Sequence, residues 1–201
     1  MTDLADRLRQ GRVVPVVTLE SADQAVPIAR ALLAGGVGAI EITLRTDAAY
    51  EGIRAVKAEV PAIALGIGTV VHSNQMDFCI DIRPDFIVTP GTTDTLYKAI
   101  EPTGLALVPG VATPSEALAA LERGYDLVKF FPAEAAGGTA MLRGMGGPLS
   151  QLRFMPTGGI TPGNAGDYLA LPNVVAVGGS WLTKDAAPAA VEAAAREASA
   201  L

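Results

Sequence analysis

Lys129 occupies a position where a charged side chain is unusual. It lies in the run DLVKFF (126–131), whose other members are mostly apolar and predict a buried strand. Burying an unpaired ammonium group costs several kcal/mol, so a lysine in such a run needs a specific reason. A neutral lysine amine is a nucleophile towards carbonyl carbons, and the Schiff base that it forms can stabilise a carbanion on the neighbouring carbon. The residue therefore points to covalent carbonyl chemistry.

Two structural roles for Lys129 compete with this interpretation. The ammonium group could pair with a buried carboxylate, or it could extend from the strand end to solvent. Side chains alternate along a strand, so Leu127, Lys129 and Phe131 share one face. The other lysines, Lys57, Lys98 and Lys184, lie in polar helical or loop segments, and no catalytic role is expected for them.

Glu41 poses the same question in the run AIEITL (39–44), where it stands between two isoleucines. It shares a strand face with Thr43 and Arg45. A carboxylate inside the protein could transfer protons in a carbonyl reaction. It could equally be a structural partner of Lys129 or Arg45, and one carboxylate beside a lysine can serve both purposes.

Further residues at predicted strand ends could bind an anionic substrate. Arg45 can hold a carboxylate through two parallel hydrogen bonds, and Thr69 in GIGTV could donate a hydroxyl to the same group. Their alternative roles are a surface arginine and a helix cap. Two glycine-rich turns, PTGGIT (156–161) and VGGSW (177–181), could bind phosphate through backbone N–H groups, with Gly158, Gly159, Gly179 and the hydroxyl of Ser180.

Eight short apolar runs alternate with Ala- and Leu-rich segments of helical spacing, such as 21–36 and 113–124. The strand candidates span 13–18, 39–44, 63–68, 85–90, 105–110, 126–131, 152–157 and 174–179. This alternation predicts βαβ units and a parallel sheet. An open doubly wound sheet would carry a glycine-rich fingerprint after its first strand, which VVPVVTLES lacks. We therefore expect residues 1–201 to form one α/β domain, a parallel eight-stranded (β/α)8 TIM barrel with a short N-terminal helix. Such barrels place the active site at the carboxyl ends of the strands.

Composition excludes several other classes of protein. The chain has 201 residues and a net charge of -6, which argues against nucleic-acid binding. One histidine, His72, and one cysteine, Cys79, provide no cluster for zinc, so neither metal nor cofactor is expected. The sequence shows no secretory signal and no apolar run of the ~20 residues that cross a bilayer. A soluble cytoplasmic protein that acts on small molecules is the expectation.

Seven motifs, in this order, resemble those of the bacterial 2-keto-3-deoxy-6-phosphogluconate (KDPG) aldolases. They are EITLRT, GIGTV, TPG, PGVATPSE, KFFPAE, PTGGI and GGSWL, and the resemblance spans roughly residues 10 to 185. That family is a class I, metal-independent aldolase on a (β/α)8 barrel and is usually a homotrimer. The resemblance implies cleavage of the phosphorylated keto-deoxy sugar acid to pyruvate and glyceraldehyde 3-phosphate.

The same resemblance assigns roles to individual residues. It implies that Lys129 forms the Schiff base and that Glu41 transfers protons. Arg45 and Thr69 match residues that hold the pyruvate carboxylate, and Pro90 and Phe131 match pocket walls. The phosphate end is matched by Gly158, Gly159, Gly179 and Ser180.

Departures from the family pattern bear on substrate preference. VVPVV lacks an arginine that many relatives carry, and VHSN follows GTV where L-N-P is commoner. Related aldolases act on the 6-phosphogalactonate epimer or on 4-hydroxy-2-oxoglutarate. More distant alternatives are an isomerase or synthase that uses Lys129 only as a charge, and a non-catalytic sugar-phosphate binding protein.

Overall fold

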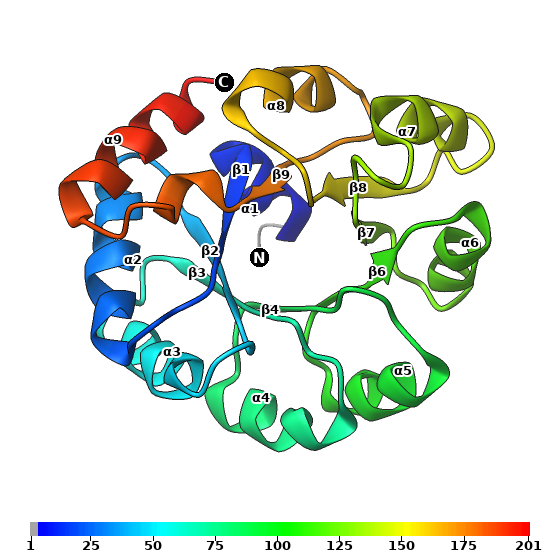
Figure 1. The fold of residues 1–201 in the computed structure, drawn as a ribbon. Coiled ribbons are helices and arrows are strands. Elements are labelled where there is room, and N and C mark those ends of the chain that lie inside the picture. Colours follow the sequence, from blue (N-terminus) through cyan, green and yellow to red (C-terminus); the bar gives the residue numbers. More distant parts are fainter. Residues whose placement is uncertain (1–3) are drawn as a thin grey trace.

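Strands and helices alternate along the chain in the computed structural model, which describes residues 4–201 (Figure 1). The strands are β1 (Val13–Val17), β2 (Ala39–Thr43), β3 (Ala64–Gly68), β4 (Phe86–Val88), β5 (Leu107–Val108), β6 (Gly110–Val111), β7 (Leu127–Phe130), β8 (Arg153–Pro156) and β9 (Val177–Gly179). The α-helices are α1 (Leu4–Gly11), α2 (Ala25–Ala34), α3 (Ala48–Glu59), α4 (Met76–Ile82), α5 (Asp94–Ile100), α6 (Pro114–Glu122), α7 (Gly138–Gly146), α8 (Pro162–Leu169) and α9 (Pro188–Ser199). Short 3-10 helices are η1 (Ala22–Gln24), η2 (Ser73–Gln75), η3 (Glu101–Thr103) and η4 (Trp181–Thr183).

All strand pairs are parallel, which confirms the predicted α/β class. Hydrogen bonds join the strands into a six-stranded sheet of order β5-β4-β3-β2-β1-β9 and a three-stranded sheet of order β6-β7-β8. Isolated parallel bridges from Phe154 to Val174 and from Thr157 to Gly178 connect the β8 and β9 segments. The strand ladders are thus two sheets, and they differ in this respect from the expected single eight-stranded sheet.

Pro109 explains where the predicted fifth strand is divided. The run 105–110 was expected to be one strand, but β5 pairs with β4 and β6 pairs with β7 on either side of this proline. Proline has no N–H to donate to a strand ladder, so pairing is interrupted there. The carbonyl of Pro109 still accepts a hydrogen bond from the Lys129 N–H at 2.9 Å.

Alternate strand residues belong to two separate apolar clusters. In β7, Val128 and Phe130 join the larger cluster, which includes residues of most helices, while Leu127 joins a smaller cluster. The smaller cluster draws Val14, Phe86 and Met155 from β1, β4 and β8, so both sheets enclose it. Strands buried on both faces carry the nearly continuous apolar runs seen in the sequence.

Helix α1 contributes to the same inner cluster. The predicted N-terminal helix is present from Leu4, and the first three residues of that segment lie outside the described residues. Ala5 and Leu8 are fully buried in the inner cluster. The helix therefore packs on apolar side chains that the strands leave uncovered.

Sequence signals for helix ends are visible in α6, one of the predicted helices. The Thr113 hydroxyl accepts a hydrogen bond from the Glu116 N–H, and the Glu116 carboxylate accepts one from the Thr113 N–H at 2.9 Å. This reciprocal capping box, followed by Pro114, fixes the start of the helix. Gly124 follows the last turn with φ +90°, a conformation that favours glycine.

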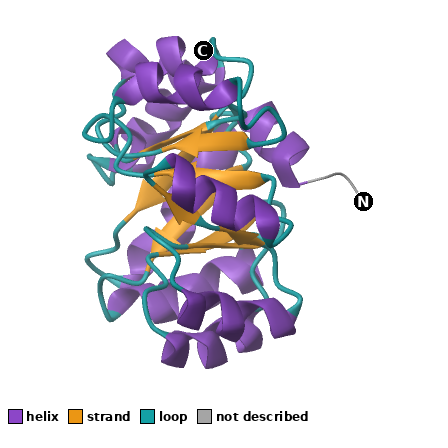
Figure 2. Ribbon diagram, turned by 90° about the vertical axis from the view of Figure 1, so that its right-hand side faces the viewer, coloured by secondary structure: helices purple, strands orange, loops and turns teal. Residues whose placement is uncertain are grey.

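Helices α2 to α9 form a ring around the strands when viewed as in Figure 1, with α1 inside the ring, and helices lie above and below the strands in Figure 2. Helix α9 packs on α2, where a side chain at Gly35 would overlap Ala195. The Ser199 hydroxyl also donates a hydrogen bond to the Gly35 carbonyl at 3.1 Å. Within residues 4–201, no helix has the length and apolar character needed to span a membrane.

Cys79 provides a probe of the packing of α4. Its side chain is fully buried, and burial raises the pKa of the thiol to about 11. We expect a disulfide reagent at pH 8 to label the native protein at least roughly 100-fold more slowly than the unfolded chain, because little accessible thiolate exists. The free energy of unfolding should also fall between pH 9.0 and about 11, since only the unfolded chain releases the proton in that window. Equal labelling rates would contradict the packed state of α4.

Candidate active site

A buried ion pair joins Lys129 on β7 to Glu41 on β2. The Lys129 Nζ donates to Glu41 Oε1 at 2.9 Å and to Oε2 at 3.2 Å. Only 4% of Lys129 and 0% of Glu41 is exposed to solvent. The structure thus brings together the two residues that the sequence singled out, although they are 88 positions apart.

Strand geometry explains why both side chains point inward. Lys129 alternates with Val128 and Phe130, which pack in the outer cluster, just as Glu41 alternates with Ile40 and Ile42. The two charged side chains therefore lie on the inner faces of strands that belong to different sheets. The negative charge of Glu41 compensates the positive charge of Lys129. Burying either group without the other would leave an uncompensated charge in the interior.

Gly68 makes room for the Glu41 carboxylate. A Cβ atom at Gly68, the last residue of β3, would overlap Oε1 of Glu41. The Thr43 hydroxyl, also buried, donates to the Val17 carbonyl at 3.0 Å and lies 2.9 Å from the Thr18 hydroxyl. Close strand approach and fixed hydroxyl groups therefore define the polar end of this interior.

Arg45 and Thr69 also meet, at the ends of β2 and β3. The Arg45 Nε donates to the Thr69 hydroxyl at 3.2 Å. Thr69 has φ +58°, in the left-handed region that a β-branched residue rarely adopts and that costs about 1–3 kcal/mol. Backbone strain of this kind is concentrated at functional sites.

A cavity of about 590 Å³ opens at the carboxyl ends of β1, β8 and β9. Six of the predicted site residues line it: Arg45, Phe131, Gly158, Gly159, Gly179 and Ser180. Lys129, Glu41, Thr69 and Pro90 are not among its lining residues. Phe131 connects the two parts, because its ring lines the cavity and its centroid lies 5.6 Å from the Lys129 Nζ. Pro90 instead packs against Gly110, where an added Cβ would overlap its backbone.

The turn at Gly158 and Gly159 is held in place from behind. Both glycines have positive φ, +98° and +79°, so other residues would be strained there. The Glu134 N–H donates to the Gly158 carbonyl at 3.1 Å. The Tyr168 hydroxyl donates to the Glu134 carboxylate, and burial together with this carboxylate holds the pKa of Tyr168 well above its usual range. The turn that faces the cavity is thus anchored to the segment that follows β7 and, through Tyr168, to α8.

The cavity is also lined by residues that the sequence motifs did not single out. They include Thr18, Thr157, Thr161, Thr183 and Lys184. Thr18 and Thr157 follow predicted strands, so their position at strand ends was a usable signal. Lys184 had no such signal, since it lies five residues after the end of β9 in a polar segment.

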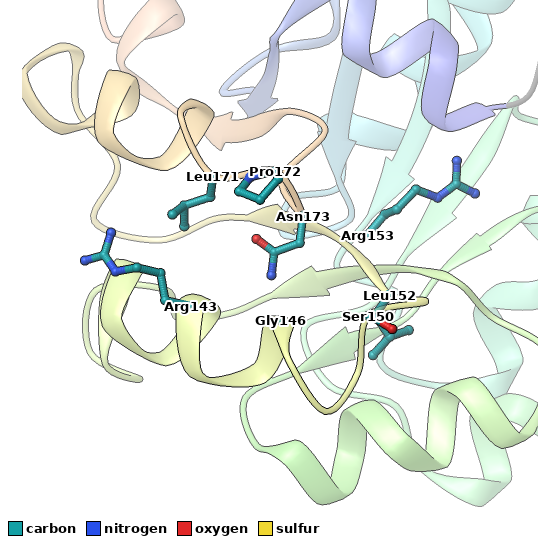
Figure 3. Close-up of a pocket in the computed structure, with 8 residues that line it drawn as sticks. All are labelled: Arg143, Gly146, Ser150, Leu152, Arg153, Leu171, Pro172 and Asn173. Atoms are coloured by element: carbon teal, nitrogen blue, oxygen red, sulfur yellow. The ribbon is translucent and has the colours of Figure 1, made fainter.

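A second cavity, of about 330 Å³, lies at the opposite ends of β8 and β9 (Figure 3). The side chains of Arg143 and Asn173 lie on two sides of it, below and beside the 171–172 turn, and Arg153 pairs with Asp126 at 2.6 Å. It contains none of the predicted site residues. Within the described part of the chain, no group of three or more His, Cys, Asp or Glu residues is placed to bind a metal.

Comparison with known proteins gives a consistent result across nearly the whole chain. The family model described as "Aldolase: KDPG and KHG aldolase" matches residues 4–195. The chain is 46% identical over 175 residues to the KHG/KDPG aldolase of Escherichia coli K12, which covers 87% of this chain and 82% of that protein.

Solved structures agree with the sequence comparison. The KDPG aldolase of Zymomonas mobilis ZM4 with 3-phosphoglycerate has a TM-score of 0.93 and 42% identity, and the match covers 100% of this chain and 96% of that one. The KDPG aldolase of Legionella pneumophila, with pyruvate captured as a covalent carbinolamine, has a TM-score of 0.92 and 36% identity over 99% and 98% of the two chains. This chain belongs to the KDPG and KHG aldolase family.

Proposed function

We propose that this chain is a class I aldolase that reversibly cleaves 2-dehydro-3-deoxy-6-phosphogluconate to pyruvate and glyceraldehyde 3-phosphate. The observation that carries the proposal is the buried contact of 2.9 Å between the Lys129 Nζ and the Glu41 carboxylate. It supplies a nucleophile and a base within hydrogen-bond reach of each other, which Schiff-base chemistry requires.

The first steps form the covalent intermediate. Glu41 accepts a proton from the Lys129 ammonium group, because the two groups already share a hydrogen bond. The free amine attacks the C2 carbonyl carbon of the substrate and gives a carbinolamine; Glu41 then returns its proton to the departing hydroxyl group, so that water leaves, the protonated imine forms and Glu41 is again a carboxylate. The covalent carbinolamine of pyruvate in the Legionella relative supports this sequence of steps.

The second half breaks and then restores bonds. Glu41, through a water molecule, removes the proton of the C4 hydroxyl, the C3–C4 bond breaks, and glyceraldehyde 3-phosphate leaves. The electron pair of that bond moves into the imine and gives an enamine. C3 then takes up a proton, and hydrolysis of the imine releases pyruvate and regenerates Lys129. Lys129 is thus regenerated at the end of the cycle, and Glu41 transfers protons in both halves of the reaction.

The two ends of the substrate carry different anions, and the site offers different groups for them. We assign the pyruvate carboxylate to Arg45 and Thr69, which already contact each other at 3.2 Å. The phosphate is assigned to the turns at Gly158, Gly159, Gly179 and Ser180, which line the same cavity. Phe131 and Pro90 are assigned to the walls between the two ends.

Related substrates use the same two charged residues. The 6-phosphogalactonate epimer differs at C4, and 4-hydroxy-2-oxoglutarate lacks the phosphate. The cavity with its two glycine-rich turns favours a phosphorylated substrate over 4-hydroxy-2-oxoglutarate. Rates of pyruvate release from the three compounds rank them, and a faster rate with 4-hydroxy-2-oxoglutarate would contradict our choice.

We further propose that residues 1–201 form one closed (β/α)8 barrel and assemble as a homotrimer. Support for closure comes from the bridge between Thr157 and Gly178 and from the inner cluster shared by both sheets.

An apolar groove between α6 and α7, with Leu118 45% exposed, supports association of the chains into the trimer. We expect one cooperative unfolding transition and a light-scattering mass of three chains of 20.6 kDa each. The mass of a single chain would contradict the trimer.

The central prediction is a covalent adduct on Lys129. Incubation of the protein with pyruvate and borohydride should leave a reduced pyruvate adduct, and peptide mass analysis should place it on Lys129 alone. Lys57, Lys98 and Lys184 serve as internal controls in the same digest. An isomerase, a synthase or a binding protein that uses Lys129 only as a charge would give no adduct. The variant Lys129→Arg is the negative control and should also give no adduct.

Replacing the carboxylate tests the proton transfer. Glu41→Gln should lower kcat roughly 10²- to 10⁴-fold, because the amide cannot accept the protons that the reaction moves. The change also removes the counter-ion of a buried ammonium group, which costs about 3–5 kcal/mol when a partner is lost. Circular dichroism should therefore accompany the kinetics, with Glu122→Gln on α6 as a control for an exposed carboxylate outside the site. A folded variant with unchanged kcat would rule out the assigned role.

A further inference from the structure

Lys184 brings a second cationic side chain to the candidate active site. It follows η4, the short helix after β9, and lines the cavity of about 590 Å³ together with Gly179, Ser180 and Trp181. Arg45 is the other cation among the lining residues, and it comes from the end of β2. Two positive side chains that are far apart in the sequence, Arg45 and Lys184, therefore line the same cavity.

No carboxylate competes for the Lys184 ammonium group. Across residues 4–201, Lys184 forms neither an ion pair nor a hydrogen bond with any other residue. Its neighbour Asp185 is already occupied, since its carboxylate accepts the Ala187 N–H at 2.9 Å ahead of α9. None of the described lining residues is Asp or Glu, although the chain has 21 acidic residues and a net charge of -6.

We propose that Lys184 binds the phosphate group of the substrate and makes the site selective for phosphorylated substrates. The identity of that substrate rests on the proposed function. Backbone N–H groups and a serine hydroxyl can bind phosphate but bring no full positive charge. A lysine adds a mobile point charge on a flexible stem, which suits a phosphate at the rim of an open cavity.

This arrangement also orients the substrate. Arg45 is bonded to Thr69 near the proposed carboxylate position, whereas Lys184 lies on the segment that follows the Gly179–Ser180 turn. A molecule with an anion at each end then fits in one direction only with respect to the Lys129 amine. Because the protein as a whole is acidic, the attraction is local to this cavity.

The test uses two substrates with the same carbon skeleton. Variants Lys184→Gln and Lys184→Arg are compared with wild type and with Lys98→Gln, which alters an exposed lysine on α5 outside the cavity. Each protein is assayed with 2-keto-3-deoxy-6-phosphogluconate and with unphosphorylated 2-keto-3-deoxygluconate. We expect Lys184→Gln to raise KM for the phosphorylated substrate roughly 5- to 20-fold, the range for one charge-assisted contact. The kcat value and cleavage of the unphosphorylated substrate should change less than about twofold, and Lys184→Arg should restore most of the loss.

A binding measurement keeps this inference separate from the proposed reaction. Titration of inorganic phosphate into each protein requires no turnover, and Lys184→Gln should weaken binding at least roughly fivefold relative to wild type and Lys98→Gln. Equal phosphate binding by all proteins, no phosphate binding by wild type, or equal losses with both substrates would overturn the role of Lys184. Absence of cleavage by wild type would instead refute the proposed function, and the titration would still decide the role of Lys184.

Discussion

The contact between Lys129 and Glu41 is the constraint on which the interior depends. A buried pair of charges adds little stability by itself, and apolar residues of similar volume often stabilise a protein more. Two strands from different sheets must nevertheless bring these side chains within 2.9 Å, with Gly68 leaving space for the carboxylate. The other buried polar side chains of the described residues, Thr43, Thr89 and Thr157, are uncharged, so each member of the pair has only the other as a buried charged partner. The ion pair restricts how the interior can pack, and this restriction is explained if the pair carries out the proposed catalysis.

Much of the arrangement could be predicted because strand periodicity is a strict rule. Apolar runs located the strands within a few residues, and alternation placed Lys129 on one strand face with Leu127 and Glu41 on one strand face with Thr43. Helix capping was also readable, as Thr113 and Glu116 show. These features depend on local interactions or on a repeat of two residues, and both are encoded in short stretches of sequence.

Other features depend on contacts that no local pattern encodes. The break at Pro109 was visible as a residue type, but its effect on pairing depends on which strands lie on either side. Thr69 adopts a backbone conformation that its residue type opposes. Lys184 lies in a segment without regular periodicity, so only the path of the chain after β9 brings it to the cavity. Tertiary context decides in all three cases.

The left-handed backbone at Thr69 has a consequence for attempts to improve the protein by selection. Asparagine adopts this conformation more readily than a β-branched residue, so Thr69→Asn would relieve strain and raise heat tolerance. The same change would remove the hydroxyl that receives the Arg45 hydrogen bond. Screening for thermal stability alone would therefore select against the proposed carboxylate-binding residues, and directed-evolution libraries should hold this position fixed.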